Sequence, residues 1–190
     1  MNDRFEAISR LIAAVARQED QELRPLGRGI AFVPEQAFAY LVGKAITARS
    51  SDIFGAPDVR WSTDELIAGF GRASLVFHPA APGKAVVVEF KRKFGPNLSY
   101  LAHLSRLGSI DEHKYDRLFC GLMFSESMKP IVEPLNDPRM RAVEPASNLR
   151  VRPAYSPFEY FEKWPKLVTP VYCVVGVWQL LGRARAEDAP

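Results

Sequence analysis

Cysteine is scarce in this chain, which has 190 residues and only two cysteines, Cys120 and Cys173. Both lie in apolar runs, and neither forms a CxxC pair or stands at a zinc-binding distance in sequence from a histidine. Neither has a neighbour that would activate a thiol for nucleophilic attack. We therefore expect both cysteines to be small, buried, apolar side chains.

Long apolar runs and phosphate-binding loops are also missing. No apolar run reaches the roughly 18 residues needed to cross a bilayer, and the first ten residues contain no apolar signal core. The patterns GxxxxGK[ST], GxGxxG and GxSxG are absent, which disfavours P-loop and dinucleotide binding as well as serine hydrolysis. The lack of a signal core and of a membrane-spanning run predicts a cytoplasmic protein.

Charge of one sign is not in large excess. The formal net charge is +3, with 25% charged and 47% hydrophobic residues, the composition of an ordinary globular protein. Such a charge is compatible with nucleic acid but does not require it. The length suits one main core, and we expect a helix and linker at residues 1–30, a domain at 31–180 and a frayed tail at 181–190.

Apolar periodicity predicts two helices near the N-terminus. Residues 5–15 carry apolar side chains at steps of three and four, which is typical of a helix that packs or mediates pairing in a homodimer. A second helix is expected over residues 35–48, because Pro34 suits a helix start, and Glu35 then lies in its first turn. Residues 50–71 resemble a loop with one short strand or helical turn.

The rest of the chain alternates between strand and helix patterns. Residues 72–78 and 85–91 predict a hairpin, 97–118 a helix broken at Gly108, and 119–124 a buried strand. Beyond these, we expect an irregular stretch over 129–157, a short helix over 156–164 and a buried strand over 171–181. This order predicts an α/β sandwich with a mixed sheet.

The second hairpin strand ends in a glutamate and a lysine on one face. Side chains alternate along a strand, so Val87, Glu89 and Lys91 share a face while Val86, Val88 and Phe90 share the other. If Val76 pairs with Val87, Ser74 lies opposite Glu89 and shares its face. The strand then presents a small polar cluster at one end of an apolar sheet.

On these residues the chain resembles the PD-(D/E)xK nuclease superfamily. The similarity comprises Glu89-Phe90-Lys91 after an apolar strand, the preceding strand "GRASLVFH", and the upstream helix bearing Glu35, over roughly residues 34–124. It implies the restriction-endonuclease-like sandwich, in which a mixed central β-sheet is flanked by helices.

The resemblance also implies a chemistry. Glu89 and the carbonyl of Phe90 would bind Mg²⁺ or Mn²⁺, which activates water for phosphodiester hydrolysis. Lys91 would orient that water or offset charge on the phosphate, and Glu35 would be an accessory acid that reaches the metal through water.

Ser74 departs from the family pattern, which has a metal-binding Asp at this place. A hydroxyl is a poor substitute for a carboxylate, so a site without another acid would hold magnesium weakly. Asp58 lies upstream at a permitted spacing and would serve as a metal ligand only if its loop folds back over Glu89; Asp64 and Glu65 are similar candidates.

Three hypotheses follow from the sequence. One is a metal-dependent DNA nuclease, with Arg92, Lys93 and Lys114 as nucleic-acid-binding residues. Another is a catalytically inactive module of the same fold, which binds nucleic acid or protein. The last is an unrelated α/β protein in which Glu89 and Lys91 form only a surface ion pair.

Overall fold

The computed structural model describes residues 3–80, 82–94, 99–125, 149–160 and 171–183. Its helical elements are α1 (Arg4–Leu23), α2 (Glu35–Thr47), α3 (Ser50–Phe54), α4 (Ser99–Leu107) and the short 3-10 helices η1 (Arg24–Leu26) and η2 (Ile30–Phe32). Its strands are β1 (Val59–Ile67), β2 (Gly71–Pro79), β3 (Ala85–Phe94), β4 (Tyr115–Ser125), β5 (Leu149–Tyr160) and β6 (Val171–Arg183). The chain is a mixed α/β protein.

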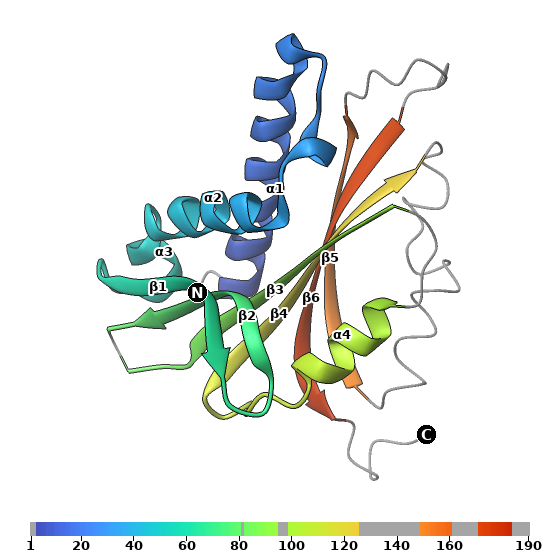
Figure 1. Ribbon diagram of the computed structural model, residues 1–190. Coiled ribbons are helices and arrows are strands. Elements are labelled where there is room, and N and C mark those ends of the chain that lie inside the picture. The colour runs from blue at the N-terminus through green and yellow to red at the C-terminus, as the bar shows by residue number, and fades with distance from the viewer. Residues whose placement is uncertain (1–2, 81, 95–98, 126–148, 161–170, 184–190) are drawn as a thin grey trace.

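A single six-stranded sheet has the order β1-β2-β3-β4-β6-β5. Only β3 and β4 are parallel, and every other neighbouring pair is antiparallel. The parallel pair requires a crossover, and α4 lies on that connection (Figure 1). The expected mixed sheet is therefore present as an open and mostly antiparallel one.

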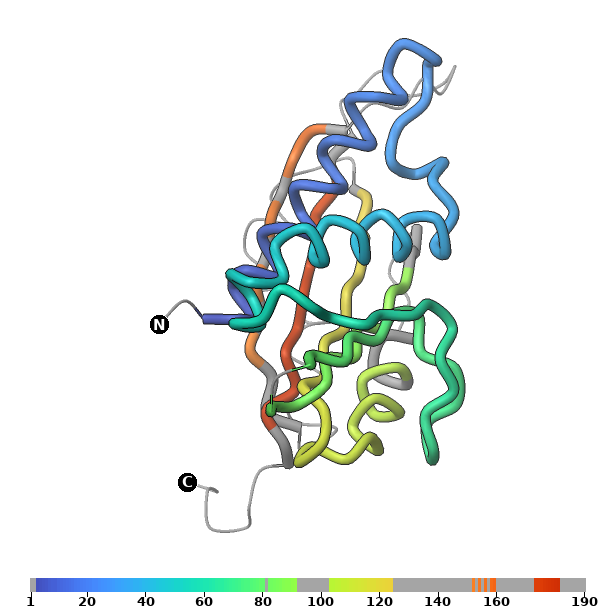
Figure 2. Tube along the Cα trace, turned by 90° about the vertical axis from the view of Figure 1, so that its left-hand side faces the viewer, coloured from blue at the N-terminus to red at the C-terminus, as the bar shows by residue number. Residues whose placement is uncertain are grey.

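Helices cover both faces of the sheet. Helices α1 to α3 share one hydrophobic core with Leu75, Phe77 and Val88, whereas α4 packs on the opposite face beside Val76 and Val87. Figures 1 and 2 show α1 running alongside β5 and β6, with α2 crossing it. The alternation predicted for β3 is confirmed, because Val86, Val88 and Phe90 belong to the first core and Val87 to the second.

The N-terminal helix is longer than its apolar pattern. Helix α1 continues through the charged residues to Leu23, where buried Asp20 accepts hydrogen bonds from Arg24 and from the backbone N–H of Ile30. The apolar side expected to pack or pair, which includes Phe5 and Ile8, is buried against the chain's own sheet. None of the helices in the described ranges is both long and apolar enough to span a membrane.

Two expected elements in the first two thirds of the chain are different in the structure. The presumed loop at 50–71 contains α3 and the nine-residue strand β1, whose alternation is broken where Asp64 adopts a left-handed φ of 60°. The broken helix over 97–118 ends at Leu107, and a turn then leads into β4 at Tyr115. Buried Arg117 holds this turn by donating to the carbonyls of Gly108 and Ile110.

The C-terminal half also differs. Residues 149–160 form the edge strand β5, so the irregular stretch and the short helix expected there are wrong over this range. An edge strand tolerates Pro153 and Pro157, because its outer side needs no ladder donors. The expected final strand is confirmed as β6 and continues to Arg183. Residues 129–148 and 161–164 of these predictions lie outside the described part of the chain.

Candidate functional site

The ladder between β2 and β3 pairs Leu75 with Val88, Val76 with Val87 and Phe77 with Val86, which confirms the register predicted from sequence. At Ser74, the residue before Leu75, the Glu89 carboxylate replaces the main-chain hydrogen bonds of the ladder. Its Oε2 accepts from the backbone N–H of Ser74 at 3.2 Å and from the Ser74 hydroxyl at 2.9 Å. A side chain therefore bridges the two strands where main-chain pairing would otherwise continue.

The β1 side of Ser74 is irregular as well. Thr63 pairs with Leu75 and Glu65 with Ala73, while Asp64 between them has positive φ. Asp tolerates this conformation better than most residues. Ser74 thus has no ladder partner in β1 or in β3, and its N–H donates to the Glu89 carboxylate instead.

The other oxygen of Glu89 lies between two cations. Its Oε1 is 3.3 Å from Lys91 Nζ and 3.0 Å from Arg106 Nη2. The Glu89 side chain is only 3% exposed, so its charge is compatible with burial only because these cations and Ser74 neutralise and hydrogen-bond it. Arg106 comes from α4, on the same side of the sheet.

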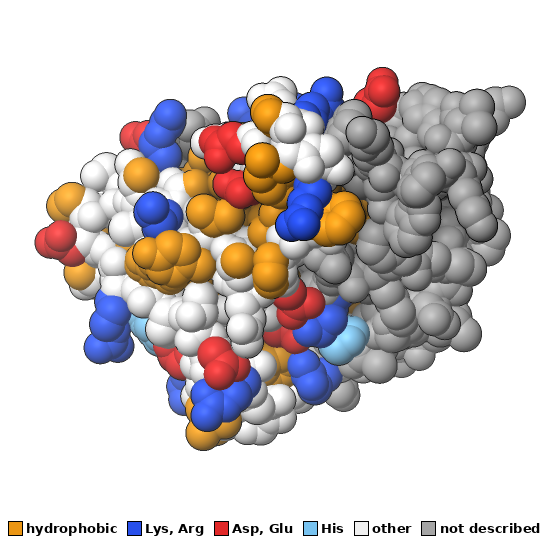
Figure 3. All heavy atoms as spheres, turned by 45° about the horizontal axis from the view of Figure 1, so that its top comes forward, with side chains coloured by type: hydrophobic (Ala, Val, Ile, Leu, Met, Phe, Trp, Pro, Cys, Tyr) orange, Lys and Arg blue, Asp and Glu red, His pale blue; other side chains and the backbone are white. Residues whose placement is uncertain are grey.

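Lys91 links this carboxylate to a second one. Its Nζ is 3.0 Å from Oε1 of Glu35, which lies in the first turn of α2. Negative charge is favourable at a helix N-terminus, where the backbone N–H groups are unpaired. The structure thus brings four residues into one cluster of contacts: Glu35, Ser74, Glu89 and Lys91. Figure 3 shows acidic, basic and histidine side chains next to one another on the surface.

Helix α4 supplies two residues that the sequence argument missed. The Arg106 guanidinium lies 4.7 Å from the centre of the Phe70 ring, a cation–π arrangement, while His103 stacks on Phe119 at 6.3 Å. Burial lowers the pKa of His103, and the nearby charges of Lys91 and Arg106 lower it further. The sequence carried only part of this signal, because residues three apart on a helix share a face, but the spacing does not say which face meets β3.

The donor set does not fit a resident magnesium or manganese ion. Each oxygen of Glu89 already has two donors, and two of those donors are cations that oppose a divalent ion nearby. The Ser74 hydroxyl is engaged as well, because it donates to Glu89 and accepts from the Phe90 N–H at 3.2 Å. Among the residues described, no three His, Cys, Asp or Glu side chains form a group that could hold a metal.

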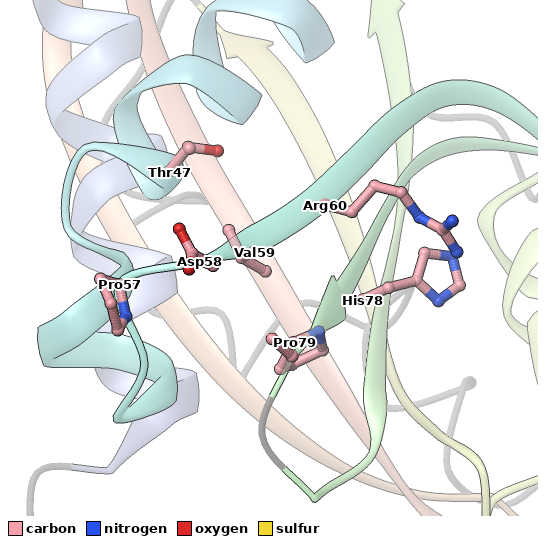
Figure 4. A pocket seen from close by; sticks show the side chains of 8 residues that line it. Thr47, Pro57, Asp58, Val59, Arg60, His78 and Pro79 are labelled. Carbon is pink, nitrogen blue, oxygen red and sulfur yellow. The ribbon is translucent and has the colours of Figure 1, made fainter.

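The structure does not bring Asp58 to this cluster. Its carbonyl accepts from Ala80 N–H at 3.3 Å, beyond the end of β2. Ala80 is six residues from Ser74, a separation of about 20 Å along an extended strand. Asp58 instead lines an open pocket of about 580 Å³ together with Thr47, Arg60 and His78. In Figure 4 the side chains of Arg60 and His78 lie beside each other, apart from that of Asp58.

The proposed nucleic-acid-binding residues are also dispersed. Lys114 directly precedes β4 and lies beside the start of β3, where its carbonyl accepts from Ala85 N–H, and its ammonium is 3.8 Å from Asp111. Four residues of extended strand separate Ala85 from Glu89, or about 13 Å. Arg92 and Lys93 continue β3 in register with β4, and their side chains lie outside the described part of the chain.

The remaining acidic candidates belong to other contacts. Asp64 of β1 pairs with Arg72 of β2 at 3.0 Å, and both side chains are exposed. Glu65 hydrogen-bonds to Ser62 and to His78 Nε2, at 2.9 Å for the histidine. Burial alone would raise the pKa of Glu65, but the hydrogen bonds from Ser62 and His78 outweigh it, and the pKa is lowered.

The cysteines behave as the sequence predicts. Cys120 and Cys173 are both buried, and burial raises the pKa of each thiol. Neither is available as a thiolate nucleophile at neutral pH.

Comparisons of the chain with protein-family models, with curated proteins and with solved structures gave no match. The assignment of a function therefore depends on the geometry of the site.

Proposed function

We propose that the protein has the restriction-endonuclease-like fold and is related to the PD-(D/E)xK nucleases. The support is the order of elements over residues 34–124: α2 with Glu35, the β2–β3 hairpin with Glu89 and Lys91, then α4 and the parallel strand β4. The contacts of Glu89 with Ser74 and of Lys91 with Glu35 add to this, because the resemblance implies that these residues share one site.

Its function, in this proposal, is to bind nucleic acid, with DNA the expected form, without cutting it. The observation that carries this is the charge balance at Glu89. The carboxylate is neutralised by Lys91 and Arg106, and Ser74 stands where the family has a second metal-binding acid. Such a site keeps cationic groups near the surface but lacks the paired carboxylates that hold a divalent ion.

The experiment combines binding and cleavage. Fluorescence anisotropy with labelled duplex DNA in EDTA is expected to show binding, and incubation with plasmid in Mg²⁺ or Mn²⁺ is expected to leave the plasmid intact. Titration calorimetry should detect no magnesium binding by the wild type and recovered binding by Ser74→Asp. Absence of DNA binding at low salt, or magnesium binding by the wild type, would refute the proposal.

A metal-dependent nuclease is the second candidate. It is favoured by the contacts of Lys91 with Glu35 and Glu89, because these three are the catalytic residues that the resemblance implies. Plasmid cleavage that is present in the wild type and lost in both Glu89→Ala and Lys91→Ala would establish it. Equal cleavage in all three proteins would instead point to a contaminating nuclease.

A further inference from the structure

Arg106 is fixed in place on two sides. Its Nη2 donates to Glu89 Oε1 at 3.0 Å, and its guanidinium lies over the buried ring of Phe70 at 4.7 Å. A long side chain normally loses much rotational freedom when it binds a ligand. Here the structure has already restricted that freedom, so less of it remains to be lost on binding.

The fixed guanidinium nevertheless reaches solvent. The Arg106 side chain is 47% exposed and that of Lys91 is 27% exposed, although both contact a carboxylate that is 3% exposed. A guanidinium has five N–H donors in one plane, and the contact with Glu89 uses Nη2. The arrangement therefore presents hydrogen-bond donors outward from a buried anchor.

The two cations are close enough to share one anion. Lys91 Nζ and Arg106 Nη2 lie 3.3 and 3.0 Å from the same oxygen, so they are at most 6.3 Å apart. Charge-assisted hydrogen bonds to phosphate oxygens are about 2.7–2.9 Å long. A single phosphate group can span two donors at this separation.

Resting on the proposed nucleic-acid binding, we propose that Arg106 and Lys91 together bind a backbone phosphate, and that Arg106 supplies the positive charge that a divalent ion supplies in a metal-dependent nuclease. A planar guanidinium suits the non-bridging oxygens of a phosphodiester, which it contacts in pairs. Glu89 and Phe70 act as positioning residues that hold the guanidinium. Binding at this site is then independent of metal.

The test measures the affinity of the full chain for fluorescein-labelled duplex DNA in EDTA, over a range of salt concentrations. Arg106→Ala should weaken binding about tenfold, and should lower the slope of log affinity against log salt by about 0.9, the value of one phosphate contact. Arg106→Lys should keep the slope and recover part of the affinity. The matched control is Arg10→Ala, an exposed arginine on α1, which should leave both quantities unchanged.

A structural role for Arg106 gives a different pattern. If the variant only loosened the site, Arg106→Ala would lower stability in urea while the salt slope stayed that of the wild type. That result would overturn the inference while leaving nucleic-acid binding itself intact. So would a loss of affinity in Arg106→Ala no larger than in Arg10→Ala, or DNA binding that requires magnesium. Failure of the wild type to bind DNA at all would refute the proposed function instead.

Discussion

The buried carboxylate of Glu89 makes a strong prediction about stability. Replacing it by glutamine keeps the shape of the side chain and removes its charge. One orientation of the amide turns its NH₂ group toward Lys91 and Arg106, and the other turns it toward the N–H of Ser74. Donors therefore face donors in either case.

The magnitude follows from what is lost. A buried donor without an acceptor costs about 1–3 kcal/mol, and a broken, fully buried ion pair about 3–5 kcal/mol. Lys91 and Arg106 reach solvent and can be rehydrated, so the loss stays below the second range. We expect Glu89→Gln to lower the free energy of unfolding by about 2–3 kcal/mol, and Tm by about 5–10 °C for a chain of this length.

Urea unfolding followed by far-UV circular dichroism and tryptophan fluorescence measures this change. The matched control is Glu6→Gln, because Glu6 pairs with Arg152 in a partly exposed position on α1 and should contribute at most about 1 kcal/mol. Equal stability of Glu89→Gln and the wild type, within about 0.5 kcal/mol, would show that the described contacts do not hold the carboxylate.

Further predictions concern the packing, the backbone and the pH response. Gly43→Ala places a Cβ 2.4 Å from the Trp61 ring and should lower the free energy of unfolding, measured in urea, by about 1–3 kcal/mol. In the control Gly83→Ala, the new Cβ meets nothing within 4 Å, and stability should not change. Equal effects of the two substitutions would contradict the contact between α2 and β1. Asp64→Gly should leave Tm unchanged or raise it, while Asp64→Val should lower the free energy of unfolding by about 1–2 kcal/mol. A valine variant more stable than the glycine variant would contradict the left-handed backbone at residue 64. The lowered pKa of His103 means that the unfolded chain takes up a proton near pH 6.5 before the folded chain does, so the free energy of unfolding should fall as pH drops below about 6.5. His103→Gln should reduce this slope in urea titrations between pH 5 and 7.5, and an unchanged slope would assign the effect to other groups.

Much of the β2–β3 hairpin could be predicted from sequence, because strong local patterns determine it. The β-branched run at residues 86–88 favours a strand, and alternation alone assigns its two faces, which fixes the side on which Glu89 lies. Since one face is apolar throughout, slipping the register by one residue would expose the core. A slip by two residues would keep both faces, so the pairing of Val76 with Val87 was an assumption, which the structure confirms.

The elements that sequence missed depend on their pairing partners and not on a local pattern. Strand β1 is mostly polar and loses its alternation at Asp64, so only pairing with β2 identifies it as a strand. Strand β5 contains prolines, which argue against a strand locally, and it gains its ladder from β6, the next strand along the chain. The contact of Arg106 with Glu89 joins a helix to a strand across one face of the sheet, and no local pattern states which residues of that helix face the strand.

The neutral side chain of Ser74 is consistent with the balance of charge around Glu89. Glu35 and Glu89 contribute two negative charges, Lys91 and Arg106 two positive ones, and the serine adds none, so the cluster is neutral without a metal. An aspartate at position 74 would add a carboxylate in contact with Glu89 and would leave one negative charge uncompensated. A divalent cation would relieve that excess. Ser74→Asp, and not a change at Asp58, is therefore the substitution that separates a metal site from a site balanced by Lys91 and Arg106.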